Sequence, residues 1–328
     1  MTMSFHPTTP STTDASLIDL TAMLQFKRPA YSPVEKEFNR KFLLPLGCKP
    51  DKMGNLFLTI GNHPNVLWSS HTDTVHKDYG WQNIQLDGDY IKLARSQKKK
   101  PSNCLGADCT AGIWIMREMI KAKVPGVYIF HAAEEIGGRG SRYIANDTPI
   151  VLDGIDFAVA FDRRGVSDII THQAGERGAS DEFANSIKPQ LPVGYAASRN
   201  GIFTDTANYS ALIAECTNLS VGYFDEHTKE ERLFLPHILM LKDAMLEIDT
   251  TKFVSARDKT KVEYDDWGDD IFGFGTSTTS TDARSSFWRT YNRYVNEPKT
   301  LEQWVRANPS AADLLDQLGI TLKDAQGY

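Results

Sequence analysis

The segment HAAEEIGGRGS, residues 131–141, places two adjacent glutamates between an apolar run and a glycine-rich turn. Because neighbouring carboxylates repel each other, something must offset the charge of Glu134 and Glu135. A metal ion, a lysine partner or water could each do so. Taken alone, such a pair is more typical of a solvated turn. The choice therefore depends on which other residues share its location.

Histidine and carboxylate side chains also occur at the ends of other apolar runs. Ligands of open α/β sheets bind at the carboxyl ends of the strands, so we expect these side chains to lie close together. Imidazole and carboxylate groups are zinc ligands. Two metal ions about 3.5–4 Å apart need one carboxylate that bridges them. The candidate ligands are His71, Asp108, Glu135, Asp162 and His227, with Asp108 as the bridge.

This ligand set gives the two glutamates different roles. His71 and Asp162 would bind one ion, and Glu135 and His227 would bind the other. Glu134 would then be free to act as a base. The sequence thus predicts two zinc ions per chain as cofactors. Histidine and carboxylate sites also accept cobalt or manganese, so the physiological metal stays open.

Short apolar stretches alternate with helical patterns between the N-terminus and residue 250. The predicted strands are residues 55–61, 65–71, 126–133, 157–162 and 218–224. The predicted helices are residues 16–26, 32–47, 110–123, 180–187, 204–214 and 236–248. In the second helix, Ser32, Pro33 and Glu35 occupy the positions of a capped helix start. This alternation predicts an α/β fold, a three-layer sandwich with a central, mostly parallel sheet flanked by helices.

Composition argues against several classes of function. The 328-residue chain has a net charge of -6, which argues against nucleic acid as its main partner. No apolar run approaches the roughly 20 residues of a membrane span, so no membrane partner is expected. The N-terminus is polar and lacks the apolar core of a signal peptide. The cysteines show no paired spacing, which favours reduced thiols in the cytoplasm: Cys48, Cys104, Cys109 and Cys216.

The domain organisation follows from local composition. Residues 1–15 are predicted to be a flexible tail, and residues 16–250 to form the catalytic domain. Residues 251–285 are predicted to be a linker or extended segment, because the chain becomes rich in Gly, Ser, Thr and Asp near residue 262. Residues 286–328 are predicted to be a small helical extension, too short for a sizeable core of its own.

Six short motifs occur in order along roughly residues 16–245: DKMGNLFL, SHTDTV, GADCTAG, EEIGGRGS, AFDRRG and HTKEE. Each motif is weak alone. Together they resemble those of the co-catalytic zinc peptidases, which include bacterial leucyl aminopeptidases, tripeptidases, glutamate carboxypeptidases and related deacylases. The resemblance implies the same five metal ligands. It also implies that Glu134 is the general acid/base and that Asp73 orients His71. Glu231 closes the last motif, and Cys109 departs from the Asp, Asn or Met of many relatives.

The resemblance also points to a subclass. Deacylases and tripeptidases of this family usually carry a lid domain between the last aspartate ligand and the final histidine. The segment between Asp162 and His227 is too short for such a domain, so the chain resembles the lid-less aminopeptidase branch. By this resemblance Asp205, in GIFTDTANY, would lie near the metals against a substrate amine. His172 is a candidate for a substrate-binding or oxyanion role.

The sequence therefore favours a dinuclear zinc hydrolase, an aminopeptidase that acts on small peptides or aminoacyl substrates. A carboxypeptidase or an N-acyl amino acid deacylase is the alternative, and a non-catalytic interaction protein is less favoured. Arg163 and Arg164 are expected to balance the charge of Asp162. Binding of a substrate carboxylate is the weaker interpretation for these two arginines. The oligomeric state stays open.

Overall fold

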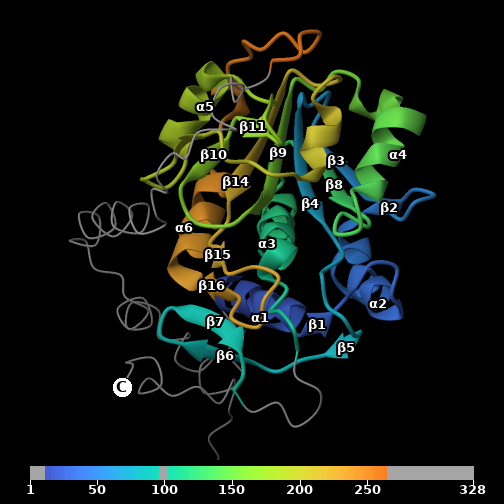
Figure 1. The fold of residues 1–328 in the computed structure, drawn as a ribbon, viewed down its shortest axis with the longest axis vertical. Coiled ribbons are helices and arrows are strands. Elements are labelled where there is room, and N and C mark those ends of the chain that lie inside the picture. Colours follow the sequence, from blue (N-terminus) through green and yellow to red (C-terminus); the bar gives the residue numbers. More distant parts are fainter. Residues whose placement is uncertain (1–11, 96–101, 264–328) are drawn as a thin grey trace, which may run out of the picture.

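A computed structural model describes residues 12–95 and 102–263 (Figure 1). Helix α1 (Thr12–Leu24) begins inside the segment that was predicted to be a tail. The helical extension predicted for residues 286–328 lies outside the described residues, as does the later part of the predicted linker.

A central sheet of eight strands forms the middle layer, in the order β13-β10-β14-β9-β4-β8-β3-β2. Its four inner strands, β14, β9, β4 and β8, run parallel to one another. Strands β3 and β2 are antiparallel additions at one side, and β10 runs antiparallel to β14 at the other. The predicted α/β fold with a mostly parallel centre is confirmed. The strands are β2 (Lys49–Pro50), β3 (Leu56–Ile60), β4 (Val66–His71), β8 (Gly126–His131), β9 (Phe157–Arg163), β10 (Asp168–Ile170), β13 (Ala196–Ser198) and β14 (Glu215–Ser220).

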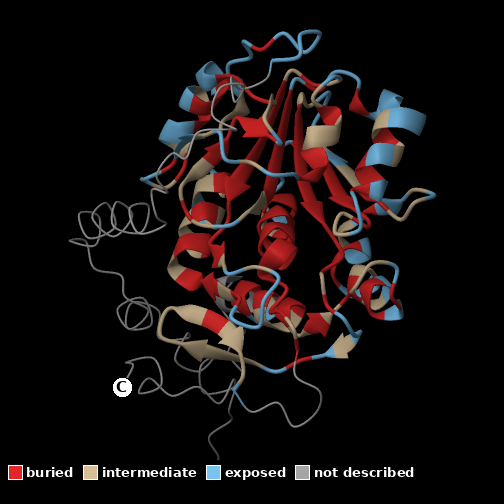
Figure 2. Ribbon diagram, viewed as in Figure 1, coloured by how far each residue is buried: buried red, intermediate tan, exposed pale blue. Residues whose placement is uncertain are grey.

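Helices cover both faces of this sheet, and the strands are buried between them (Figure 2). Alternate residues of a strand enter opposite cores, because successive side chains of a strand point to opposite faces. Trp68 of β4 belongs to the larger core and Leu67 to the smaller one. The larger core includes α1, α3 (Ala107–Lys121) and α6 (Leu235–Leu246). The smaller core includes Ile144 of α4 (Arg139–Asp147) and Tyr209 of the 3-10 helix η4 (Asp205–Tyr209).

A second, antiparallel sheet has the strand order β15-β16-β7-β6. Residues 218–224 were predicted to be one strand, but the segment is divided between β14 in the central sheet and β15 in this one. Gly222, with φ 99°, lies at the break and allows the chain to change direction. The sheet consists of β6 (Ile84–Asp87), β7 (Tyr90–Leu93), β15 (Tyr223–Phe224) and β16 (Arg232–Phe234).

The remaining elements are short and lie mostly between those above. Two-residue strands pair as β1 (Phe26–Lys27) with β5 (Gly80–Trp81), and as β11 (His172–Gln173) with β12 (Glu176–Arg177). The other helical segments are α2 (Pro33–Phe42), α5 (Asp181–Ile187), η1 (Leu44–Leu46), η2 (Pro149–Leu152), η3 (Lys188–Gln190) and η5 (Thr250–Lys252).

Two helix predictions differ from the structure in detail. Ser32 caps α2 as expected, and its hydroxyl accepts from the Glu35 amide at 3.1 Å. The Glu35 carboxylate accepts from the Tyr31 amide instead of closing the box on Ser32. The helix predicted for residues 204–214 is reduced to η4. The Thr206 hydroxyl bonds to the Thr217 carbonyl of β14, and such contacts hold the segment against the sheet as a single tight turn.

Residues 251–263 are the described part of the predicted linker or extended segment, and two buried residues, Phe253 and Arg257, attach this part to the central sheet. The Phe253 ring packs edge-on against Phe157 of β9 and Phe183 of α5. The Arg257 amide donates to the Glu215 carboxylate at 2.9 Å. Its guanidinium donates to several backbone carbonyls of the loop before β14.

Candidate functional site

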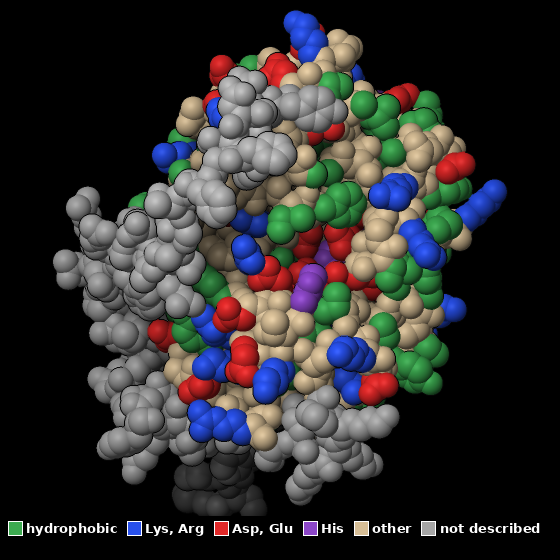
Figure 3. Space-filling model, viewed as in Figure 1, with side chains coloured by type: hydrophobic (Ala, Val, Ile, Leu, Met, Phe, Trp, Pro, Cys, Tyr) green, Lys and Arg blue, Asp and Glu red, His purple; other side chains and the backbone are tan. Residues whose placement is uncertain are grey.

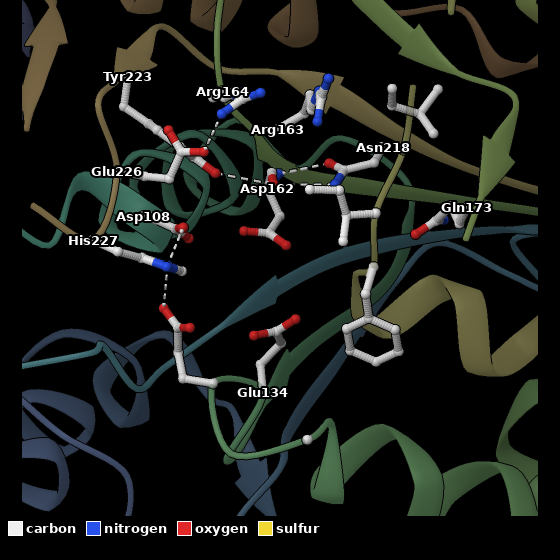
Figure 4. A pocket seen from close by; sticks show the side chains of 16 residues that line it. Asp108, Glu134, Asp162, Arg163, Arg164, Gln173, Asn218, Tyr223, Glu226 and His227 are labelled. Carbon is white, nitrogen blue, oxygen red and sulfur yellow. Dashed lines mark hydrogen bonds and ion pairs between the residues drawn. The ribbon is translucent and has the colours of Figure 1, made fainter. Parts of the chain in front are cut away.

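The carboxyl ends of the inner strands meet at one edge of the sheet. Strands β4 and β8 end in register, with His71 opposite His131, and β9 lies on the other side of β4. Acidic side chains and a histidine line the hollow at this edge (Figures 3 and 4). The cavity has a volume of about 340 Å³, and four of the five predicted ligands line it: Asp108, Glu135, Asp162 and His227. His71 lies beneath, 1% exposed.

Asp108 contacts a different histidine with each of its carboxylate oxygens. Its Oδ1 lies 3.0 Å from His71 Nε2, and its Oδ2 lies 3.1 Å from His227 Nε2. This is the arrangement expected of a carboxylate that could bridge two metal ions. The peptide bond between Asp108 and Cys109 is cis.

The loop that carries Asp108 is held by Glu231. One oxygen of the buried Glu231 carboxylate accepts from the amides of Leu105 and Gly106 at 2.9 and 3.0 Å. The other accepts from the Asp108 amide at 3.1 Å. The closing glutamate of the HTKEE motif therefore positions Asp108, a role that the sequence did not assign to it.

His71 and Asp162 lie on one side of this arrangement. His71 Nε2 is 3.2 Å from Asp162 Oδ1, and its Nδ1 is 3.0 Å from the carbonyl oxygen of Asp73. The Asp73 carboxylate is farther from the ring, at 3.5 Å. The backbone of Asp162 is fixed by Asn218, whose amide group both accepts from its N–H and donates to its carbonyl.

Glu134 and Glu135 reach the same cavity because the backbone turns after β8. The strand ends at His131, and Ala133 has a left-handed conformation with φ 59°. The amides of both glutamates then donate to the Asp73 carboxylate, Glu134 to Oδ1 at 3.0 Å and Glu135 to Oδ2 at 3.2 Å. Asp73 therefore fixes the turn as well as contacting His71.

The position of Glu135 is completed by His227. Its Oε1 lies 3.2 Å from His227 Nε2, yet this buried oxygen has no hydrogen-bond partner among the described residues. His227 comes from the loop between β15 and β16 and has φ 63°. It reaches the cavity from the second sheet, and not from the end of a central strand as the sequence suggested.

The electrostatics of the cavity are those of crowded, buried acids. Burial and neighbouring carboxylates raise the pKa of Glu134 to about 10 and that of Asp162 to about 7. Burial also raises the pKa of Glu135. The pKa of His227 is also raised, to about 11, because the Asp108 and Glu135 carboxylates lie close to its ring and favour its charged form. Burial is the main cause for the three acids and the neighbouring carboxylates add to it; a divalent cation would offset the negative charge of these carboxylates.

The donor atoms fit metal ions. Three groups of ligand atoms have all members within 4.8 Å of one another: His71 with Asp108, Cys109 and Asp162; His71 with Glu134 and Glu135; Asp108 with Glu135 and His227. The first and third groups share Asp108. The unpartnered oxygen of Glu135 lies in the third. The Cys109 thiol donates to the Phe161 carbonyl at 2.9 Å and contacts Ser70, so it is engaged away from the cavity.

Two tentative substrate residues lie elsewhere. Asp205 is 1% exposed, and its carboxylate faces His131 at 3.3 Å. His172 is buried, with its Nδ1 3.0 Å from the Thr171 hydroxyl. Neither is among the described residues that line the cavity. The amine contact expected for Asp205 and the substrate role suggested for His172 therefore stay predictions, without support from this geometry.

Other residues complete the cavity wall. Arg163 and Arg164 line it, but they pair with Asp168 and Glu226, and not with Asp162. The signal for them was the DRRG sequence at the end of β9. The rest of the wall was not predicted from the sequence, and includes Ile170, Gln173, Ile202, Phe203 and Tyr223.

Comparison with solved structures gives the chain clear neighbours. Aminopeptidase PepT from Bacillus cereus has a TM-score of 0.56 at 16% identity, covering 71% of this chain and 96% of that one. A tripeptidase from Staphylococcus aureus has a TM-score of 0.57 at 16% identity, covering 72% and 97%. The TET1 peptidase of Pyrococcus horikoshii, which can assemble into a tetrahedron or a large octahedral shell, has a TM-score of 0.53 at 14% identity, covering 70% and 98%.

The chain has the fold of these peptidases. No family model and no curated protein matches the sequence. Among the described residues, no helix combines the length and apolar character needed to cross a membrane.

Proposed function

We propose that this protein is a dinuclear metallo-aminopeptidase that acts on small peptides. The observation that carries the proposal is the placement of Asp108, with each carboxylate oxygen directed at a different histidine. His71 and Asp162 would hold one ion, and Glu135 and His227 the other. When bound, the two ions would supply a polarised scissile carbonyl and a water whose pKa is lowered toward about 7.

The residues of the chain supply the remaining steps. Glu134 lies beside the ligand atoms and lines the cavity without being needed as a ligand. It takes the proton of the attacking water and passes it to the leaving amine. Asp73 holds Glu134 and Glu135 by their amides, and Glu231 holds the loop that presents Asp108. The cavity of about 340 Å³ has room for a short peptide.

The proposal is tested by metal content and substrate class together. Protein reconstituted in excess zinc should contain near two equivalents per chain. It should cleave aminoacyl amides and lose this activity to a chelator. Cobalt and manganese should be compared with zinc, because the donor set accepts all three. A zinc content of one equivalent per chain, even in excess zinc, would exclude the bridging role of Asp108. Faster cleavage of N-acetylated amino acids would favour the deacylase alternative.

A further inference from the structure

Arg163 directly follows the ligand candidate Asp162 at the end of β9 and lines the same cavity. Its side chain is 12% exposed, and its Nε donates to Asp168 Oδ2 at 3.0 Å. Among the described residues, its terminal nitrogens Nη1 and Nη2 have no hydrogen-bond partner. A largely buried guanidinium that uses one of its five N–H groups retains a fork of donors for a ligand.

Arg164 differs from Arg163 in this respect. Its Nη1 donates to Glu226 Oε1 at 2.9 Å, and its side chain is 54% exposed. Solvent therefore already satisfies much of the Arg164 guanidinium. Figure 4 shows both arginines on the side of Asp162 away from Glu134, at the margin of the cavity. Of the two arginines, Arg163 is the one whose side chain is largely shielded from solvent.

A planar guanidinium with two free terminal nitrogens binds a carboxylate through two parallel hydrogen bonds. We propose that Arg163 determines specificity by holding a carboxylate of the substrate close to the scissile bond. This inference rests on the proposed function. Because Arg163 lines the same cavity as Glu134 and Asp162, the carboxylate belongs to one of the residues flanking that bond. It is either the side chain of an acidic N-terminal residue or the C-terminal carboxylate of a dipeptide.

Other residues that line the same cavity are compatible with such a substrate. Ile170, Ile202 and Phe203 offer an apolar surface for methylene groups, and Gln173 adds one amide. Ile202 is 72% exposed and Phe203 37%, so both are accessible from the cavity mouth. The apolar wall alone would not distinguish an acidic side chain from its amide. The Arg163 guanidinium would make that distinction.

The first test compares matched substrates with the zinc-loaded protein. Glutamyl and glutaminyl anilides differ only in a side-chain carboxylate, and leucylglycine and its amide differ only in the terminal one. One of these pairs should show a preference for the carboxylate in kcat/KM of about 10-fold to 100-fold. The pair that responds identifies the source. Ratios near one in both pairs would overturn the proposal.

The second test uses three variants. Arg163→Gln should abolish the preference, and Arg163→Lys should restore part of it, because lysine keeps the charge but not the fork. Arg142→Gln is the matched control, since Arg142 is an exposed arginine of α4 outside the cavity wall. Its preference should equal that of the wild type. An unchanged preference in Arg163→Gln would place carboxylate recognition elsewhere.

Binding measurements separate this proposal from the proposed function. Calorimetry should show tighter binding of L-glutamate than of L-glutamine, or of leucylglycine than of its amide when the Glu134→Gln variant prevents turnover. Failure to cleave any peptide, with Arg163-dependent carboxylate binding retained, would refute only the peptidase activity. Cleavage of neutral peptides with no carboxylate preference and no binding difference would refute only the role of Arg163.

Discussion

Glu134 and Glu135 are chemically identical, and their separate roles depend on where the turn after β8 places them. Glu135 faces His227 and Asp108, whereas Glu134 has no place in that ligand group. Glu134→Gln keeps the shape of the side chain but removes the proton acceptor. We expect metal content to survive while kcat falls by about 10²–10⁴-fold.

Glu135→Gln should behave differently, because a neutral amide replaces an anionic ligand. We expect the variant to lose first the metal ion assigned to Glu135 and His227, and added zinc should restore part of its activity. Metal analysis and turnover of the two variants, measured side by side, check the assignment. A nearly active Glu134→Gln, together with an inactive Glu135→Gln that retains both metals, would reverse the two roles.

Glu35 makes stability depend on pH. Its carboxylate is 4% exposed, and it accepts from the Tyr31 amide and the Thr72 hydroxyl. Burial raises its pKa from 4.5 to about 7, so the folded chain holds this proton more tightly than the unfolded chain. The stabilisation is complete below about pH 4.5. It is lost as pH rises through about 7, on the order of 3 kcal/mol.

Glu35→Gln should remove this part of the pH dependence. The free energy of unfolding, measured in urea at pH 5 and pH 7.5, should decrease less for the variant than for the wild type. The Thr72 hydroxyl can still donate to the amide oxygen, so a gross loss of fold is not expected. An equal decrease in the free energy of unfolding in the two proteins would mean that Glu35 is not the source of this pH dependence.

At the scale of elements, α3 lies unusually close to the sheet. A Cβ atom at Gly112 would lie 2.0 Å from the Phe161 carbonyl oxygen and 2.5 Å from the Ser70 hydroxyl. Gly112→Ala must therefore push α3 away from β4 and β9, which we expect to cost about 3 kcal/mol of stability. Because Ser70 and Phe161 adjoin two ligand candidates, zinc affinity should fall as well.

Chemical denaturation and zinc titration measure both consequences. Lys121→Ala, at the partly exposed end of the same helix, is the control. It removes surface ion pairs with Asp19 and Glu118 and should change stability by no more than about 1 kcal/mol. A Gly112→Ala variant as stable as this control would mean that α3 can shift without strain.

The inner strands could be predicted because burial on both faces leaves short, continuous apolar runs such as FAVAF in β9. The ends of those runs also pointed to His71, Glu135 and Asp162, whereas Asp108 lies at the start of α3 and His227 on a loop of the second sheet. Asn55, in the DKMGN motif, accepts from the Ala132 amide and donates to the Gly140 carbonyl. A local sequence motif thus holds a turn that lies far away in the chain.

Other features had no local signal. An alanine gives no indication of a left-handed backbone, yet Ala133 adopts one at the turn that presents the glutamates. Arg28 reads as an ordinary surface cation. It is fully buried, with its Nε donating to the Thr72 carbonyl next to His71. The apolar wall of the cavity comes from segments that meet only in the folded chain. The sequence therefore indicated the candidate metal ligands but not the residues that form the cavity wall.

At the scale of the whole molecule, the described fold extends beyond His227, the last of the candidate ligands in the chain. Phe253 and Arg257 attach residues 250–263 to the sheet, and Arg177 bonds to Glu263. A chain that ends after Glu263 should therefore keep its two metals and its turnover. A chain that ends after Ser255 loses the Arg257 contacts and should unfold at a lower temperature.

Thermal unfolding, zinc content and kcat of the two truncated chains and the full-length chain test this boundary. Similar stability of the two truncations would mean that the Arg257 contacts contribute little. A chain ending after Glu263 that folds and binds zinc but has no activity would show that residues 264–328 contribute to the site.

Asp73 contacts residues proposed for metal binding as well as the residue proposed for proton transfer, which limits the substitutions that this position could accept. Its carboxylate holds the amides of Glu134 and Glu135 and lies beside His71. A substitution there would alter metal affinity and proton transfer together. Asn218, in contrast, contacts the backbone of Asp162 and neither glutamate. A substitution of Asn218 could therefore change metal preference without moving Glu134, whereas a substitution of Asp73 could not.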